Sequence, residues 1–100
     1  MEVRYADAAR EEGFAAAAWY GEQQGDLQTR FLEKWKDAEN RIVASPEIHR
    51  CFQENLRKCR FEVFPYALIF RIRGDELQVL AVMHMSRRPG YWKARGENLI

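Results

Sequence analysis

The fold is decided by residues 66–84, YALIFRIRGDELQVLAVMH, where two strand-forming runs flank Gly74-Asp75. Apolar residues at a two-residue period predict β-strands, and a glycine-aspartate pair between such runs predicts a two-residue hairpin turn. This turn places apolar partners opposite one another on a single face: Ile72 with Leu77, Phe70 with Val79, Leu68 with Ala81, and Tyr66 with Met83. We therefore expect this face to cover the core of the protein.

A third strand is predicted ahead of the hairpin, from about residue 57. If Phe64-Pro65 turns the chain, the pairs on the core face are Val63 with Tyr66, Phe61 with Leu68, and Cys59 with Phe70. The three strands then agree on which side is apolar.

The opposite face of this sheet combines an apolar strip with a cationic border. The strip pairs Ile69 with Leu80 and Ala67 with Val82, next to His84, and the border holds Lys58, Arg60, Arg71 and Arg73. A sheet face that nothing covers is normally polar, so we interpret the strip as a surface for a protein partner. The alternative is that residues 89–100 fold back over it.

Residues 6–44 predict two helices. In the second, apolar residues recur at helical spacing: Leu27, Phe31, Trp35, Ala38 and Ile42. The first is expected from Asp7, as N-cap, to Gln24, with a narrow side made of Ala9, Gly13, Ala16 and Ala17. Gly25-Asp26 ends one helix and starts the next, which predicts an antiparallel hairpin.

Together these elements predict one α+β domain over residues 1–100. The N-terminal antiparallel helical hairpin packs on a three- to four-stranded antiparallel sheet, the fourth strand being an edge strand that contains Val3 and Tyr5.

The composition is that of an ordinary soluble protein, with 47% hydrophobic and 31% charged residues. The longest apolar run, Phe14 to Tyr20, is much shorter than the roughly 20 residues that span a bilayer, and no signal peptide is evident, so we expect a cytoplasmic protein without membrane partners. Cys51 and Cys59 are then free thiols, and with His49 and His84 they match no zinc spacing. We expect neither metal nor cofactor.

Residues 82–93, VMHMSRRPGYWK, gather a histidine, two arginines and two aromatics after the last strand. We expect His84 to close that strand, Pro89 to turn the chain, and Tyr91 and Trp92 to anchor the tail against the protein. Arg87 and Arg88 have no acidic neighbours in sequence, and we expect them to remain free for a target.

Three segments carry a resemblance to a known family: ADAAREEGFAAAAWY at 6–20, FPYALIFRI at 64–72 and VLAVMHMSRRPGYWKAR at 79–95. In this order, and over nearly the whole chain, they resemble the RelE/ParE superfamily of toxins from type II toxin-antitoxin modules. The resemblance implies a small intracellular toxin of that fold, neutralised by a cognate antitoxin whose disordered segment wraps it as a helix or an added strand.

The superfamily has two mechanisms. RelE-like toxins enter the ribosome and cut messenger RNA at the ribose 2′-hydroxyl, and that chemistry needs a base, an acid and cations, for which the resemblance offers His84, Tyr91 and Arg60. ParE-like toxins poison DNA gyrase and need no catalytic residue. The small net charge of +1 argues against a strong RNA binder, so we favour the ParE-like or an unassigned branch.

The resemblance and the predicted sheet face together give candidate residues for binding the target and the antitoxin. Target-binding candidates are the cations Arg87, Arg88, Lys58, Arg60, Arg71 and Arg73, and antitoxin-binding candidates are Ile69, Leu80, Val82 and Ala67. Several of the residues singled out above also have a plainer interpretation: His84 as a structural hydrogen-bonding residue, Lys58 and Arg60 as solvated edge charges, and Tyr91 and Trp92 as a hydrophobic clasp. A binding module of the same fold without toxicity is a further alternative.

Overall fold

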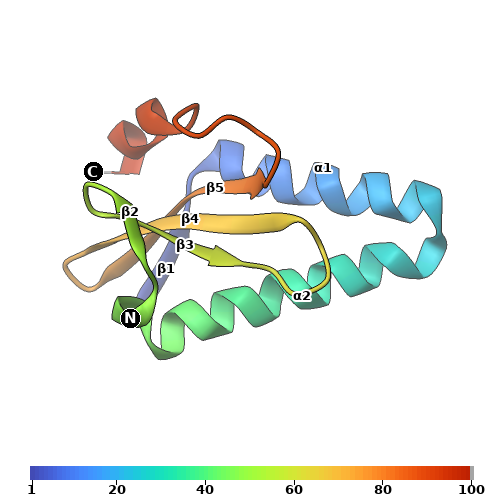
Figure 1. Ribbon diagram of the computed structural model, residues 1–100, viewed down its shortest axis with the longest axis horizontal. Helices are drawn as coiled ribbons and strands as arrows, with labels where there is room; N and C mark the ends of the chain where they lie inside the picture. Colours follow the sequence, from blue (N-terminus) through green and yellow to red (C-terminus); the bar gives the residue numbers. More distant parts are fainter. Residues whose placement is uncertain (100) are drawn as a thin grey trace.

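A computed structural model describes residues 1–99 as one α+β domain. The elements in chain order are β1 (Glu2–Tyr5), α1 (Asp7–Gln23), α2 (Gly25–Ala44), the 3-10 helix η1 (Pro46–Ile48), β2 (Cys51–Gln53), β3 (Leu56–Arg60), β4 (Tyr66–Arg73), β5 (Glu76–His84) and the 3-10 helix η2 (Lys93–Leu99). The two helices form the predicted antiparallel hairpin, and they run past the strands at the end where they join (Figure 1).

The sheet has five strands in the order β1-β5-β4-β3-β2. The predicted edge strand β1 is confirmed, but it pairs parallel to β5, with Val3 opposite Leu77 and Tyr5 opposite Val79. The strand β2, which was not predicted, adds to the other edge beside β3. The predicted α+β class, a helical hairpin packed on a sheet, is confirmed, but the sheet is mixed: it has five strands instead of three to four, and β1 is parallel instead of antiparallel.

The β4–β5 hairpin turns at Gly74-Asp75 as predicted, with Gly74 in the left-handed region at φ +61°. Ile72 pairs with Leu77 and Phe70 with Val79, as expected, but a bulge then inserts Leu80 into β5 without a partner on β4. Beyond the bulge Leu68 pairs with Val82 and Tyr66 with His84, so the predicted pairs of these two residues were wrong.

One extra residue exchanges the two faces of a strand. Val82 packs in the core between sheet and helices, whereas Ala81 and Met83 lie on the outer face, the face turned away from the helices. The prediction that Val82 and His84 belong to the outer face is therefore wrong.

The third strand has the predicted face but another register. Cys59 lies opposite Leu68 instead of Phe70, an even shift that leaves Cys59 in the core and Lys58 and Arg60 on the outer face. The loop before β4 contains Val63 at φ +73°, which is unusual for a β-branched residue.

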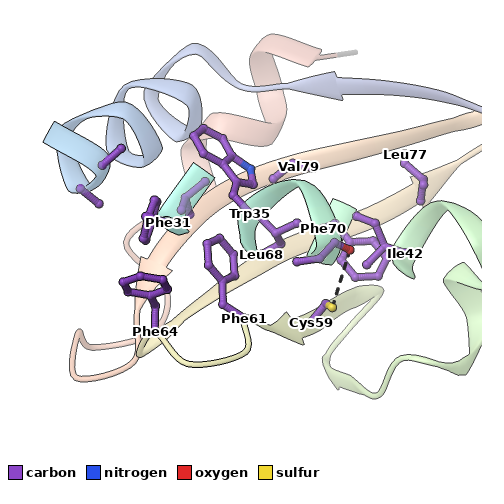
Figure 2. Packing of buried hydrophobic residues seen from close by; sticks show 14 residues of the cluster. Phe31, Trp35, Ile42, Cys59, Phe61, Phe64, Leu68, Phe70, Leu77 and Val79 are labelled. Atoms are coloured by element: carbon purple, nitrogen blue, oxygen red, sulfur yellow. Dashed lines mark hydrogen bonds between the residues drawn. The ribbon is translucent and has the colours of Figure 1, made fainter. Parts of the chain in front are cut away.

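The core lies between the helices and the sheet, as Figure 2 shows for the aromatic cluster around Phe31. The buried residues of α1 are the predicted small ones, Ala9, Gly13, Ala16 and Ala17, and those of α2 are Phe31, Trp35, Ala38 and Ile42. Gly13 is required here, because a Cβ at this position would overlap the Trp35 ring. Gln24, with extended backbone, is the single linking residue, so the prediction that Gly25 ends the first helix was wrong.

The outer face is covered by the C-terminal segment, defined here as residues 91–99. Trp92, which is 0% exposed, and Leu99 pack over Ile69 and Leu80, and Ala67 is buried as well. The expectation of an uncovered apolar strip is wrong, and the alternative, a tail folded back over the sheet, is confirmed. Among the described residues, no helix is long and apolar enough to cross a membrane.

Candidate functional site

The candidate site is the basic turn, defined here as residues 85–90, with the side chains that support it. The turn begins directly after His84, the last residue of β5, as predicted. Its first backbone hydrogen bonds run from Met85 N to Pro65 O (2.8 Å) and from Arg87 N to His84 O (3.0 Å). Its last residue, Gly90, has φ +105°, a conformation that favours glycine, and the chain there leads into the buried Trp92.

Arg87 and Arg88 differ in their surroundings. The guanidinium carbon of Arg87 lies 3.6 Å from the centre of the Tyr91 ring, and Arg87 Nη1 is 3.3 Å from Glu12 Oε2. The Arg87 side chain is nevertheless 54% exposed. Arg88 is exposed and makes no ion pair within residues 1–99. Neither arginine has an acidic neighbour in sequence, but the fold brings Glu12 of α1 to Arg87.

Glu12 is a functional candidate that the sequence interpretation missed. Its carboxylate binds Arg95 through two contacts, of 2.6 and 3.3 Å, and it accepts a hydrogen bond from Val82 N at 3.2 Å. Its side chain is only 17% exposed. A signal was present, because Glu12 follows Ala9 by three residues and precedes Ala16 by four, and so falls on the small side of the first helix.

A hollow of about 270 Å³ opens beside the turn, between α1 and the end of β5. Its lining consists of Glu12, Ala15, Ala16, Tyr66, Val82, His84, Arg87 and Tyr91. The Tyr91 hydroxyl is buried without a hydrogen-bond partner among the described residues, and this burial, with the nearby Glu12 carboxylate, raises the pKa of Tyr91. Burial also raises the pKa of Tyr66. Both phenols therefore stay protonated at neutral pH.

His84 is engaged in the turn itself. Its Nδ1 accepts a hydrogen bond from Ser86 N at 3.0 Å and lies 2.7 Å from Ser86 Oγ, and its ring meets Tyr66 edge-on. Because Nδ1 accepts from a backbone N–H, a neutral ring carries its proton on Nε2. The nitrogen that a general base would use is thus occupied, and this geometry favours the structural interpretation of His84.

The three residues considered for catalysis do not meet at one place. His84 and Tyr91 line the same hollow, on the helix side of the sheet end. Arg60 is exposed on the outer face of β3, two strands away from β5, and does not line the hollow.

The remaining predicted cations are dispersed. Arg71 is committed within the chain: its Nε donates to Gln78 Oε1 (2.7 Å) and its Nη2 to Gly96 O (2.9 Å), which ties the C-terminal segment to the sheet. Lys58 lies over the Phe52 ring, 5.5 Å from its centre, while Arg73 is exposed near the hairpin turn. Only Arg87 and Arg88 combine exposure with a position on the supported turn.

Comparison with known proteins decides the family. Residues 3–89 match the family described as ParE toxin of type II toxin-antitoxin system, parDE. The chain belongs to the ParE toxin family. The resemblance to the RelE/ParE superfamily is thereby confirmed.

A solved structure with the same fold is described as the chromosomal ParDE TA system from P. aeruginosa. Its TM-score to this ParE-family chain is 0.74 at 16% sequence identity, with 84% of this chain and 95% of that chain covered. The similarity at this identity supports the α+β fold and the order of its elements. The sequence matches none of the curated proteins compared with it.

Proposed function

We propose that this ParE-family protein inhibits bacterial growth by binding a cellular target through the basic turn, and that a co-expressed antitoxin neutralises it. The observation that supports this most is the pair Arg87 and Arg88, exposed on a turn whose two ends are fixed by β5 and by the buried Trp92. A cation on a fixed support loses less conformational entropy on binding than a cation on a loose tail.

DNA gyrase is the proposed target, and catalysis is not part of the proposal. Three observations favour a mechanism without RNA cleavage: Arg60 lies on the other face from His84, the Nδ1 of His84 is already hydrogen-bonded, and the net charge is only +1. The ribosome-dependent nuclease remains the second candidate, because His84 and Tyr91 share one hollow with Arg87. The third is a binding module of this fold without toxicity.

The target is tested with purified protein in two parallel reactions. In a gyrase reaction we expect cleaved DNA to accumulate with the wild type and not with the double variant Arg87→Ala, Arg88→Ala. The double variant Arg30→Ala, Arg50→Ala removes the same charge at two other exposed positions and should act like the wild type.

In a reconstituted translation reaction we expect no messenger cleavage. Codon-dependent cleavage that is lost in both His84→Gln and Tyr91→Phe would instead establish the nuclease alternative. Inactivity of the wild type in both reactions would favour the non-toxic module.

The antitoxin is proposed to present an acidic segment to the cations. Ile69 and Leu80 are buried under the C-terminal segment and Ala67 is buried as well, so these side chains are not on the accessible surface. Arg60 and Arg73 stay exposed at the border of the sheet, and Arg88 on the turn. Complementary charge would guide association, and so we expect the rate constant of antitoxin binding to fall with rising salt concentration.

A further inference from the structure

Glu12 connects α1, β5, the basic turn and the C-terminal segment through one carboxylate. Its Oε1 accepts hydrogen bonds from Val82 N at 3.2 Å and from Arg95 Nη1 at 2.6 Å. Its Oε2 accepts hydrogen bonds from Arg95 Nη2 and from Arg87 Nη1, both at 3.3 Å. Arg95 is itself only 19% exposed, so its short contact with Glu12 holds the C-terminal segment in place. The longer contact joins Glu12 to the exposed Arg87.

Two guanidinium groups share the Tyr91 ring. The carbon atom of the Arg87 group lies 3.6 Å from the ring centre and that of Arg95 lies 4.9 Å from it. Two cations this close to one ring repel each other, and the repulsion is strongest where water is excluded. The carboxylate of Glu12 bonds to both, so it offsets the repulsion and allows Arg87 to rest on the ring.

We propose that Glu12 is a positioning residue that holds the Arg87 guanidinium flat against Tyr91 and turns its free edge toward an oxyanion of the target. This inference rests on the proposed function for the identity of the site. Only Nη1 of Arg87 has a hydrogen-bond partner within the described residues, so Nε and Nη2 remain for a carboxylate or phosphate. A guanidinium held in this way offers two parallel donors, the arrangement that such a group prefers.

The first test is independent of toxicity and measures the order of the Arg87 side chain by ¹⁵N NMR of its Nε–Hε group. Glu12→Gln keeps an acceptor for Val82 N–H but removes the charge. We expect the Arg87 signal to lose its order and its ring-current shift in this variant, and to keep both in Glu11→Gln, the matched change at the neighbouring exposed position. An unchanged Arg87 signal in Glu12→Gln would overturn the proposal, whether or not the protein is toxic.

A second pair of variants guards against unfolding, because Glu12→Gln leaves the half-buried Arg95 without its partner. Arg95→Gln alone keeps the Glu12–Arg87 contact, and we expect Arg87 to stay ordered in it. In the double variant Glu12→Gln, Arg95→Gln the half-buried guanidinium of residue 95 is absent and so is not left without a partner. We expect the Arg87 side chain to lose its order in this variant. Equal order of Arg87 in these two variants would also overturn the proposal.

The last test asks whether Glu12 acts through Arg87 in growth inhibition. We expect Glu12→Gln to reduce inhibition at least tenfold at equal abundance of folded protein, and Arg87→Ala to do the same. The combined variant should inhibit growth as much as Arg87→Ala alone, because a residue that acts only through Arg87 has no further effect once Arg87 is removed. Multiplying effects, or full activity of Glu12→Gln, would show that Glu12 does not act through Arg87. A wild type without toxicity would refute the proposed function and leave the NMR result to decide the positioning.

Discussion

Trp92→Ala tests the anchor that holds the C-terminal segment on the sheet. Trp92 is 0% exposed and packs within the outer-face cluster of Leu56, Ile69, Leu80, Met83 and Leu99. Its ring centre lies 6.0 Å from that of Phe52 and 5.2 Å from that of Tyr91. Its indole Nε1 is buried without a hydrogen-bond partner among the side chains and backbone that the structure describes. The substitution therefore removes a large apolar contact and an unsatisfied donor together.

The two effects have opposite signs. A buried aromatic side chain removes about 150–250 Å² from water, which at about 25 cal/mol per Å² is worth roughly 4–6 kcal/mol, and measured Trp-to-Ala changes cost about 3–5 kcal/mol. An unsatisfied buried N–H costs about 1–3 kcal/mol, and alanine relieves this cost. From the midpoints of these ranges we expect a net loss of about 2–3 kcal/mol in the free energy of unfolding.

The assay is urea unfolding followed by circular dichroism, with two controls. Trp92→Phe keeps most of the ring and also removes the unsatisfied N–H, so its unfolding free energy should stay within about 1 kcal/mol of the wild type. Trp19→Ala makes the same chemical change at a site that is 55% exposed, and should cost less than about 1 kcal/mol. A loss below about 1 kcal/mol for Trp92→Ala would refute the anchor.

Three other predictions concern burial. Ile69→Glu places a charge beneath the C-terminal segment and should lower the free energy of unfolding by more than about 3 kcal/mol; a melting temperature like that of the wild type would contradict the covered outer face. In the native protein the exposed Cys51 should react with a thiol reagent at once, and Cys59, which is buried and whose pKa burial raises, only on unfolding; equal rates would contradict this packing. Burial, then the hydrogen bond to Glu39, raises the pKa of Tyr5 above its ordinary value of 10.0, so the unfolded chain releases this proton first. The free energy of unfolding should therefore fall as the pH rises above about 10, less steeply in Tyr5→Phe; identical slopes would contradict it.

Local patterns were sufficient for the helices and for the turn of the hairpin. The spacing of Phe31, Trp35, Ala38 and Ile42 identified the buried stripe, and Gly74-Asp75 placed the reversal between β4 and β5. These features depend on residues close in sequence, where period and turn chemistry carry the information.

The bulge at Leu80 leaves no trace in the pattern. Residues 79–83, VLAVM, are apolar throughout, so the sequence does not show which of them changes face. The strand β2 has only three residues, too few for an alternation to be visible. Strand existence was therefore easier to predict than strand register.

The contacts that support the basic turn could not be predicted from local sequence patterns either. Glu12 and Arg95 are 83 positions apart, and only the packing of α1 beside the end of β5 brings them together. The role of the C-terminal segment could be predicted from the sequence. The adjacent aromatic residues Tyr91 and Trp92 indicated an anchor, and Trp92 is fully buried.

Growth after induced expression tests the central claim, that this ParE-family chain is a toxin acting through its basic turn. Colony counts would be compared at equal protein abundance for the wild type, for Arg87→Ala with Arg88→Ala, and for the control pair Arg30→Ala with Arg50→Ala. We expect the wild type and the control pair to reduce the counts at least tenfold and the variant of the turn to leave them unchanged. Full toxicity of the turn variant, or normal growth with the wild type, would contradict the claim.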